Sequence, residues 1–137
     1  MAANRPQIAV LITLDSKFEI AEAFCRHLTE AGGEPWVVDL SLRGHNHKLP
    51  EVVTTLPVDH DGVEFTGLRD VSRAEASQMM LDAAQNCVRD KMDTGALRGI
   101  VGIGGANGST MACGVMRSLP PLLPKIMITP VAATAAV

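Results

Sequence analysis

Residues 98–110 read RGIVGIGGANGST, and this stretch decides the fold class of the chain. Its first half is an apolar run with β-branched side chains, which is typical of a strand buried on both faces of a sheet. A glycine-rich turn follows at once, and then a helical pattern that puts Ala112, Val115, Met116 and Leu119 on one face. Strand, glycine turn and helix in immediate succession predict a parallel α/β domain.

The residues before this stretch repeat the alternation of strand and helix. Residues 7–14 and residues 36–40 form two further apolar runs that predict strands. Ser16 and Glu19 form a candidate capping box for the helix between them. The apolar stripe of that helix is predicted to be Ile20, Phe24, Leu28 and Ala31. Such a β-α-β unit has parallel strands and a right-handed crossover.

A second capping box, Ser72 with Glu75, predicts the start of another helix. Its apolar stripe comprises Ala76, Met79, Met80, Ala83, Ala84, Cys87 and Val88. Residues 125–129 predict a fourth strand. The fold class is therefore α/β: a three-layer, Rossmann-like domain whose four-stranded parallel sheet has the order 2-1-3-4, numbered along the sequence.

The length of 137 residues fits one domain covering the whole chain. Residues 42–70 are rich in proline and glycine, and only the run VVTTLPV within them suggests extended structure. A compact domain rarely carries so long an irregular segment without a functional reason. We therefore predict a covering loop or a small insertion at residues 42–70.

Composition excludes several classes of partner. The net charge of −3 and the aromatic content of 3% argue against nucleic-acid binding, which needs clustered cations or stacking platforms. The apolar run at residues 7–14 is too short to span a membrane and has no signal-peptide cleavage region, so we expect a cytoplasmic protein. Cys25, Cys87 and Cys113 are odd in number and widely spaced, which favours free thiols in a reducing compartment.

Polar residues gather where the predicted strands end. Asp15 and Lys17 follow the first strand, Asp39 and Ser41 close the second, and Arg73 opens the helix after the long loop. The carboxyl ends of parallel strands lie at one edge of the sheet, where ligands bind. Each residue alone has an ordinary explanation as a solvated side chain or a strand-end cap. Together they predict a ligand site at that edge.

The glycine turn adds an anion site to the same edge. It directs backbone N–H groups and the positive end of a helix dipole at one point, and its glycines let a phosphate approach without meeting Cβ atoms. Ser109 and Thr110 either cap the helix or donate hydroxyls to a phosphate. The turn is no Walker A motif, and Asn107 stands where the dinucleotide motif needs its last glycine. The alternative is a tight turn that only requires small residues.

These motifs, in this order, resemble the ATP-binding N-terminal domain of the tomato mosaic virus resistance protein and its bacterial and fungal relatives. The resemblance covers nearly the whole chain and rests on TLDSK at 13–17, VVD at 37–39, SRAEA at 72–76, GIVGIGG at 99–105, MRSLP at 116–120 and PKIMI at 124–128. It implies that ATP is held by Lys17, Ser41, Arg73, Gly104, Gly105, Ala106, Asn107, Gly108 and Ser109. Asp15 also belongs to this predicted set. For an enzyme that acts on ATP with Mg²⁺, Asp15 and Asp39 are the carboxylates that could bind the metal.

The chain also departs from that family. Residues 104–109 read GGANGS where the family usually has Gly-Gly-Ser-Gly-Gly-Thr, so Ala106 removes a hydroxyl donor and Asn107 adds a side chain. Asn tolerates positive φ better than most residues, so the turn is expected to survive. Family members also continue into a TIM-barrel domain. The resemblance therefore implies that this chain is truncated relative to the family, either as a natural short paralogue or as a truncated product or isolated nucleotide-binding domain.

Three classes of function follow. The first is an ATP-binding module without turnover, in which ATP regulates a partner or stabilises a homodimer; the apolar tail and the open edge after the fourth strand favour the homodimer. The second is an enzyme domain that hydrolyses or transfers phosphate. The third is an interaction or inhibitor protein acting on a protein partner.

No catalytic residue and no metal site is predicted. The sequence has no nucleophile elbow, and no histidine is placed to activate Cys113. A cluster of His45, His47, Asp59, His60 and Asp61 matches no known metal-ligand spacing. The favoured expectation is therefore a binding domain for a small-molecule nucleotide.

Overall fold

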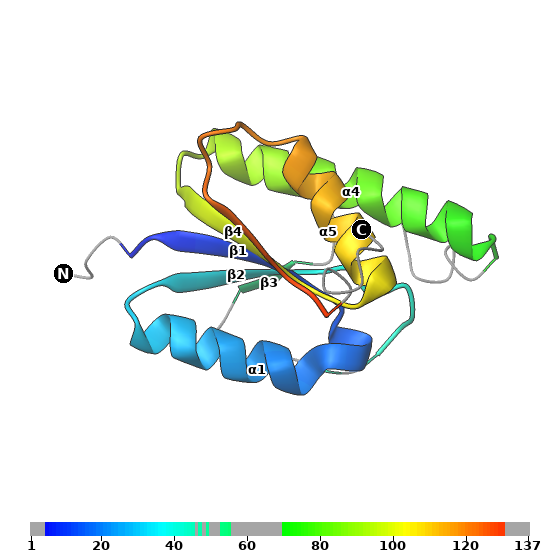
Figure 1. The fold of residues 1–137 in the computed structure, drawn as a ribbon, viewed down its shortest axis with the longest axis horizontal. Coiled ribbons are helices and arrows are strands. Elements are labelled where there is room, and N and C mark those ends of the chain that lie inside the picture. The colour runs from blue at the N-terminus through cyan, green and yellow to red at the C-terminus, as the bar shows by residue number, and fades with distance from the viewer. Residues whose placement is uncertain (1–4, 46, 48, 50–52, 56–69, 131–137) are drawn as a thin grey trace.

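The computed structural model of the protein describes residues 5–45, 47, 49, 53–55 and 70–130. Within them, five parallel strands form one sheet in the order β3-β2-β1-β4-β5. The strands are β1 (Gln7–Ile12), β2 (Glu34–Asp39), β3 (Val53–Thr55), β4 (Leu97–Ile103) and β5 (Lys125–Ile128). Helix α1 (Leu14–Glu30) covers one face of the sheet, and α4 (Arg73–Asp93) and α5 (Ala106–Arg117) cover the other (Figure 1).

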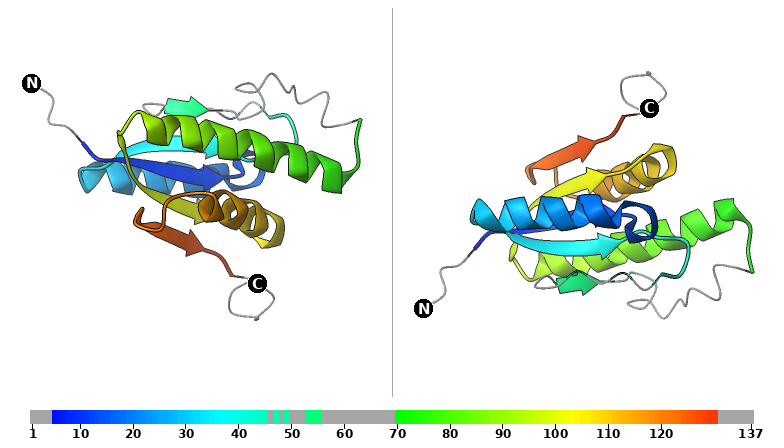
Figure 2. Two further views of the ribbon diagram at one scale, coloured as in Figure 1. Left: turned by 90° about the horizontal axis from the view of Figure 1, so that it is seen from above. Right: turned by 90° about the horizontal axis from the view of Figure 1, so that it is seen from below.

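The predicted fold class is confirmed. The four predicted strands are parallel and lie in the predicted order 2-1-3-4, as β2, β1, β4 and β5. The three-residue strand β3 extends the sheet beyond β2, so that β3 and β5 form its two edges (Figure 2). Strand β3 belongs to the segment 42–70, most of which lies outside the described residues.

The layer formed by α4 and α5 follows the sequence pattern closely. Ser72 is the N-cap of α4, and its side chain accepts a hydrogen bond of 3.1 Å from the backbone N–H of Glu75, as the capping box predicts. All members of the predicted α4 stripe are buried except Met79, which is partly buried. Most of them pack in one core with Ala112, Val115 and Met116 of α5, with Leu119 just after that helix, and with the sheet.

Helix α1 differs from the prediction in its start and its phase. It begins at Leu14 with Thr13 as N-cap, and Lys17 leaves helical geometry with φ −131° and ψ 30°, which kinks the helix. Ile20, predicted to be buried, is 49% exposed, and Ala31 is exposed as well. The side chains that pack inward are instead Leu14, Phe18, Ala21, Phe24, Cys25 and Leu28. The early start and the kink change which side chains of the helix face the sheet, so the predicted apolar stripe was partly wrong.

The three cysteines lie on helices, and all three are free thiols, as their number and spacing predict. Cys25 and Cys87 are buried, and Cys113 is partly exposed. Burial raises the pKa of the Cys25 thiol from 9.0 to about 11. Among the described residues, the helices are all too short or too polar to cross a membrane.

Candidate functional site

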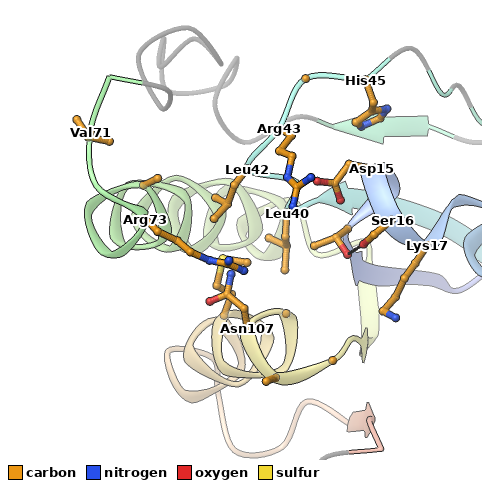
Figure 3. A pocket seen from close by; sticks show the side chains of 17 residues that line it. Asp15, Ser16, Lys17, Leu40, Leu42, Arg43, His45, Val71, Arg73 and Asn107 are labelled. Carbon is orange, nitrogen blue, oxygen red and sulfur yellow. Dashed lines mark hydrogen bonds between the residues drawn. The ribbon is translucent and has the colours of Figure 1, made fainter.

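The carboxyl ends of β1, β2 and β4 open into a cavity of about 720 Å³, at the edge of the sheet where the sequence predicts a ligand site. Its walls come from the β1–α1 turn, the segment after β2, the start of α4 and the start of α5 (Figure 3). The described lining residues are Thr13, Asp15, Ser16, Lys17, Leu40, Leu42, Arg43, Gly44, His45, Val71, Arg73, Ala76, Gly105, Ala106, Asn107, Gly108 and Met111.

Three cationic side chains line this cavity. Lys17 extends from α1 and Arg73 from the first residue of α4, on opposite sides of the opening in Figure 3. Arg43 follows β2, and its side chain points toward Asp15, the single carboxylate in the described lining. None of the three cations forms an ion pair with another described residue. The cavity therefore carries an excess of positive charge, which favours an anionic ligand.

The start of α5 presents bare backbone to the cavity. Gly105 is the N-cap of α5, no side chain caps this helix, and its first turn contains no acidic residue. The first N–H groups of a helix have no partner within the helix itself. A Cβ added at Gly105 or Gly108 would meet nothing within 4 Å, so packing does not require glycine at either position. Both glycines leave the positive end of the helix uncovered by side chains on the side of the cavity.

Gly104 and Ser109, by contrast, are part of the packing behind the cavity. A Cβ on Gly104 would lie 2.9 Å from the carbonyl carbon of Gly108. Ser109 is 1% exposed, and its Oγ lies 3.0 Å from the carbonyl oxygen of Gly104 and 2.7 Å from Oγ1 of Thr129. These contacts tie the start of α5 to the ends of β4 and β5, and neither Gly104 nor Ser109 lines the cavity.

A buried carboxylate organises the opposite wall. Asp39 is fully buried, and its Oδ1 accepts hydrogen bonds of 3.0 Å from the backbone N–H groups of Leu14 and Ser41. The hydroxyl of Ser41 donates to the same oxygen and accepts from the backbone N–H of Asp15 at 2.9 Å. Ser41 thus lies beneath the lining and holds the turn from which Asp15 and Lys17 project.

His45 completes this network at the wall of the cavity. Its Nε2 lies 2.6 Å from Oδ2 of Asp39, and its Nδ1 accepts a 3.1 Å hydrogen bond from the backbone N–H of His47. Because Nδ1 accepts, the neutral ring carries its proton on Nε2 and donates it to the carboxylate. A histidine paired with an aspartate is a common general-base arrangement. Here both ring nitrogens are occupied, so His45 has no free nitrogen for a substrate proton.

Seven of the ten predicted site residues line the cavity: Asp15, Lys17, Arg73, Gly105, Ala106, Asn107 and Gly108. The other three, Ser41, Gly104 and Ser109, lie behind the lining. Arg43 and His45 were missed, because residues 43–45 were assigned to the irregular loop. The signal that could have found Arg43 is a basic residue two positions after Ser41, close to the end of the second strand.

No group of three or more histidine, cysteine or acidic side chains is arranged for a metal ion in the part of the chain that the structure describes. Asp59, His60 and Asp61, considered with the loop histidines as a metal cluster, lie outside the described residues.

This fold and this cavity define a parallel α/β domain with a cationic cavity at the carboxyl edge of its sheet. A comparison with protein families matches residues 6–136 to the N-terminal domain of the uncharacterised protein family UPF0261. The chain belongs to the UPF0261 family.

Two relatives illustrate the extent of the match. A UPF0261 protein from Brucella melitensis is 25% identical over 130 residues, which are 94% of this chain and 31% of the relative. A UPF0261 protein from Rhizobium meliloti is 29% identical over 126 residues, or 92% of this chain and 31% of the relative. The chain therefore spans about a third of the length of the curated relatives that it matches.

This family assignment corrects the resemblance drawn from the motifs. The matched family and relatives are UPF0261, so the prediction of a tomato mosaic virus resistance protein-like family was wrong. The motifs that carried the resemblance are strand ends, a helix cap and a glycine turn. Parallel α/β domains with a ligand site at this edge share such features, so they indicate the fold better than the family.

Proposed function

We propose that this domain binds ATP, with the triphosphate over the start of α5 and between Lys17 and Arg73. One observation carries the proposal: Gly105 and Gly108 leave the helix end open in the same cavity that Lys17, Arg43 and Arg73 line. Neither glycine is needed for packing, and no described carboxylate pairs with these cations. An anionic ligand accounts for both features.

The charges of the cavity suit a polyphosphate better than a single phosphate. The end of a helix supplies only about half a positive charge. A triphosphate carries several negative charges, so most of its compensation must come from side chains. The described lining offers three cations on three separate segments against one carboxylate, Asp15. Within the described lining, Asp15 is the carboxylate available to a Mg²⁺ ion bound with ATP.

The rest of the lining suits the organic part of a nucleotide. Between and beside the cations the lining also has apolar side chains, those of Leu40, Leu42, Val71, Ala76 and Met111. Ligand sites commonly combine an apolar wall with a few placed polar groups. This wall supports a nucleotide over inorganic phosphate as the ligand.

The proposed role is that of a regulatory or dimer-stabilising site without turnover. The only histidine in the described lining uses both ring nitrogens within the protein, and Asp39 is enclosed by hydrogen bonds. An enzyme that hydrolyses or transfers phosphate is the alternative, and the release of ADP from ATP and Mg²⁺ distinguishes the two. A protein partner is the third possibility, and pull-down with and without ATP tests it.

We also propose that two copies associate through the β5 edge. Among the described residues strand β5 pairs with β4 alone, and its Ile126 and Ile128 are 58% and 48% exposed. An open edge with exposed apolar side chains is a template for pairing. The apolar tail, residues 131–137, lies outside the described residues. Light scattering that gives a monomeric mass at high concentration contradicts the dimer.

Free cysteines on all three described helices support a reducing compartment, and we propose a cytoplasmic location. Fractionation of cells that express the full-length protein tests this location.

A thermal-shift series tests the proposed ligand directly. The ligands are ATP, GTP, NAD, a sugar phosphate and inorganic triphosphate, each with and without Mg²⁺. A ligand at a hundred times its Kd stabilises the folded state by about 2.7 kcal/mol. We expect ATP to raise the midpoint and the sugar phosphate to raise it less. No shift with any of the nucleotides would reject the proposed function.

A further inference from the structure

A side-chain contact of His45 connects the segment after β2 to the sheet. His45 is 11% exposed in its side chain, and its Nε2 reaches the fully buried Asp39 at the end of β2. The other ring nitrogen accepts the backbone N–H of His47. The ring therefore bridges a rigid strand end and the backbone two residues further along. Arg43 lies in the chain between Asp39 and His45, the two residues whose side chains are in contact.

The same network reaches the other cationic wall of the cavity. Oδ1 of Asp39 holds the backbone of Leu14, and Ser41 holds that of Asp15, just before Lys17. On the far side, the ring of His47 stacks on Phe18 with centroids 4.7 Å apart and planes at 18°. Residues on both sides of Lys17 are thus connected to the segment that carries Arg43.

Arg43 depends on this bridge for its position. Its side chain is exposed and makes no hydrogen bond or ion pair with another described residue. Its place at the cavity, seen in Figure 3, is therefore set by its backbone. A segment that samples several conformations binds a ligand more weakly, in proportion to the fraction of time spent in the competent one.

We propose that His45 is a positioning residue of the ligand site, which holds Arg43 over the cavity by anchoring residues 40–45 and 47 to Asp39. This inference rests on the proposed function, because it assigns Arg43 to the anionic ligand. His45 itself does not bind the ligand, since both of its ring nitrogens are already occupied.

A double-mutant cycle, measured by calorimetry with ATP and with inorganic triphosphate, tests this role of His45. We expect His45→Ala and Arg43→Ala each to weaken binding about tenfold, and the double variant to bind no more weakly than Arg43→Ala, because residues that act as a unit are not additive. His45→Gln should recover most of the affinity, because its amide N–H can donate to Asp39. His27→Ala, which removes an exposed histidine of α1, is the matched control.

If the double variant binds these ligands about tenfold more weakly than Arg43→Ala does, the proposal is overturned, because His45 then acts independently of Arg43. Failure of His45→Gln to recover affinity would also count against it.

Hydrogen exchange without ligand tests the role of His45 independently of the proposed binding of ATP. We expect His45→Ala to speed exchange at the backbone amides of Ser41 and His47 about tenfold or more, and to leave the amides of β4 unchanged. Unchanged exchange at the amides of Ser41 and His47 would overturn the proposed role of His45, whether or not the protein binds ATP. If wild-type protein binds neither probe, the proposed function fails, and the assignment of Arg43 to a ligand fails with it.

Discussion

Gly104 and Gly108 approach each other so closely that a Cβ on Gly104 would lie 2.9 Å from the carbonyl carbon of Gly108, whereas a Cβ on Gly108 would meet nothing within 4 Å. Two glycines of one turn therefore have different roles. Gly104 lets the end of β4 pack against α5. Gly108 keeps the cavity side of α5 open, and the fold itself does not need it.

This difference predicts opposite effects of two alanine substitutions. Gly104→Ala should lower the free energy of unfolding by about 1–3 kcal/mol, because the added methyl group has no room. Gly108→Ala should leave it unchanged or raise it by up to about 1 kcal/mol, because alanine restricts the unfolded chain and favours the helix. Urea unfolding measures both values.

Gly108→Ala should nevertheless weaken ATP binding about ten- to a hundredfold, because its methyl group displaces the phosphate from a charge-assisted hydrogen bond. Calorimetry measures this change. Undiminished affinity in Gly108→Ala would mean that the turn is only a tight connection.

Arg73→Lys should also weaken ATP binding, by about tenfold. Lysine keeps the charge but cannot make the bidentate contact of a guanidinium group with a phosphate. Arg98→Lys is a suitable control, because Arg98 is exposed near the amino end of β4, away from the cavity. Equal affinities in the Arg73→Lys variant and the control would remove Arg73 from the site.

Ser109→Ala should mainly affect stability. The Ser109 hydroxyl is buried against the Gly104 carbonyl and Thr129, so its removal leaves polar groups without this partner and costs about 1–3 kcal/mol. ATP affinity of the folded variant should change little. Thr110→Ala is the control, because that exposed hydroxyl bonds only to the carbonyl of Ala106 within the helix. A large loss of affinity without loss of stability would assign the Ser109 hydroxyl to the ligand instead.

The raised pKa of Cys25, about 11 against 9.0, gives a pH dependence with a defined sign. The folded state holds the thiol proton more tightly than the unfolded state does. The associated stability is therefore fully present below pH 9 and is lost as pH rises toward about 11. Unfolding of wild type and Cys25→Ala from pH 8 to 11 should show a steeper decline for wild type. Parallel curves would mean that the Cys25 thiol does not contribute.

Local patterns predicted the elements whose signal lies within the element itself. The Ser72 cap and the stripe through Met80 depend on neighbours three or four residues away, and both were found. The start of α1 was missed because it depends on Asp39, whose side chain holds the backbone of Leu14 from 25 residues away. A periodic pattern among neighbouring residues gives no signal for a contact between residues so far apart in the sequence.

The same reason limited the prediction of the site. A sequence shows that Ser41 and Ser109 carry hydroxyls, but not that both side chains turn into the protein. Arg43 was missed because it lies in the irregular segment after the second strand, and no local pattern shows that this segment lines the cavity. Gly105, Gly108, Lys17 and Arg73 were found, because the edge of a parallel sheet fixes their position.

The central claim is that this cavity binds ATP through its cations and the open end of α5. Lys17 is partly buried at the kink of α1, and its side chain lines the cavity. The most direct measurement is the calorimetric titration of ATP into wild type, Lys17→Ala and Arg26→Ala, an exposed cation of the same helix that is not part of the described lining. We predict that wild type and Arg26→Ala bind ATP with equal affinity, and that Lys17→Ala binds it about ten- to a hundredfold more weakly. Equal affinity in all three proteins, or no binding by wild type, would contradict the claim.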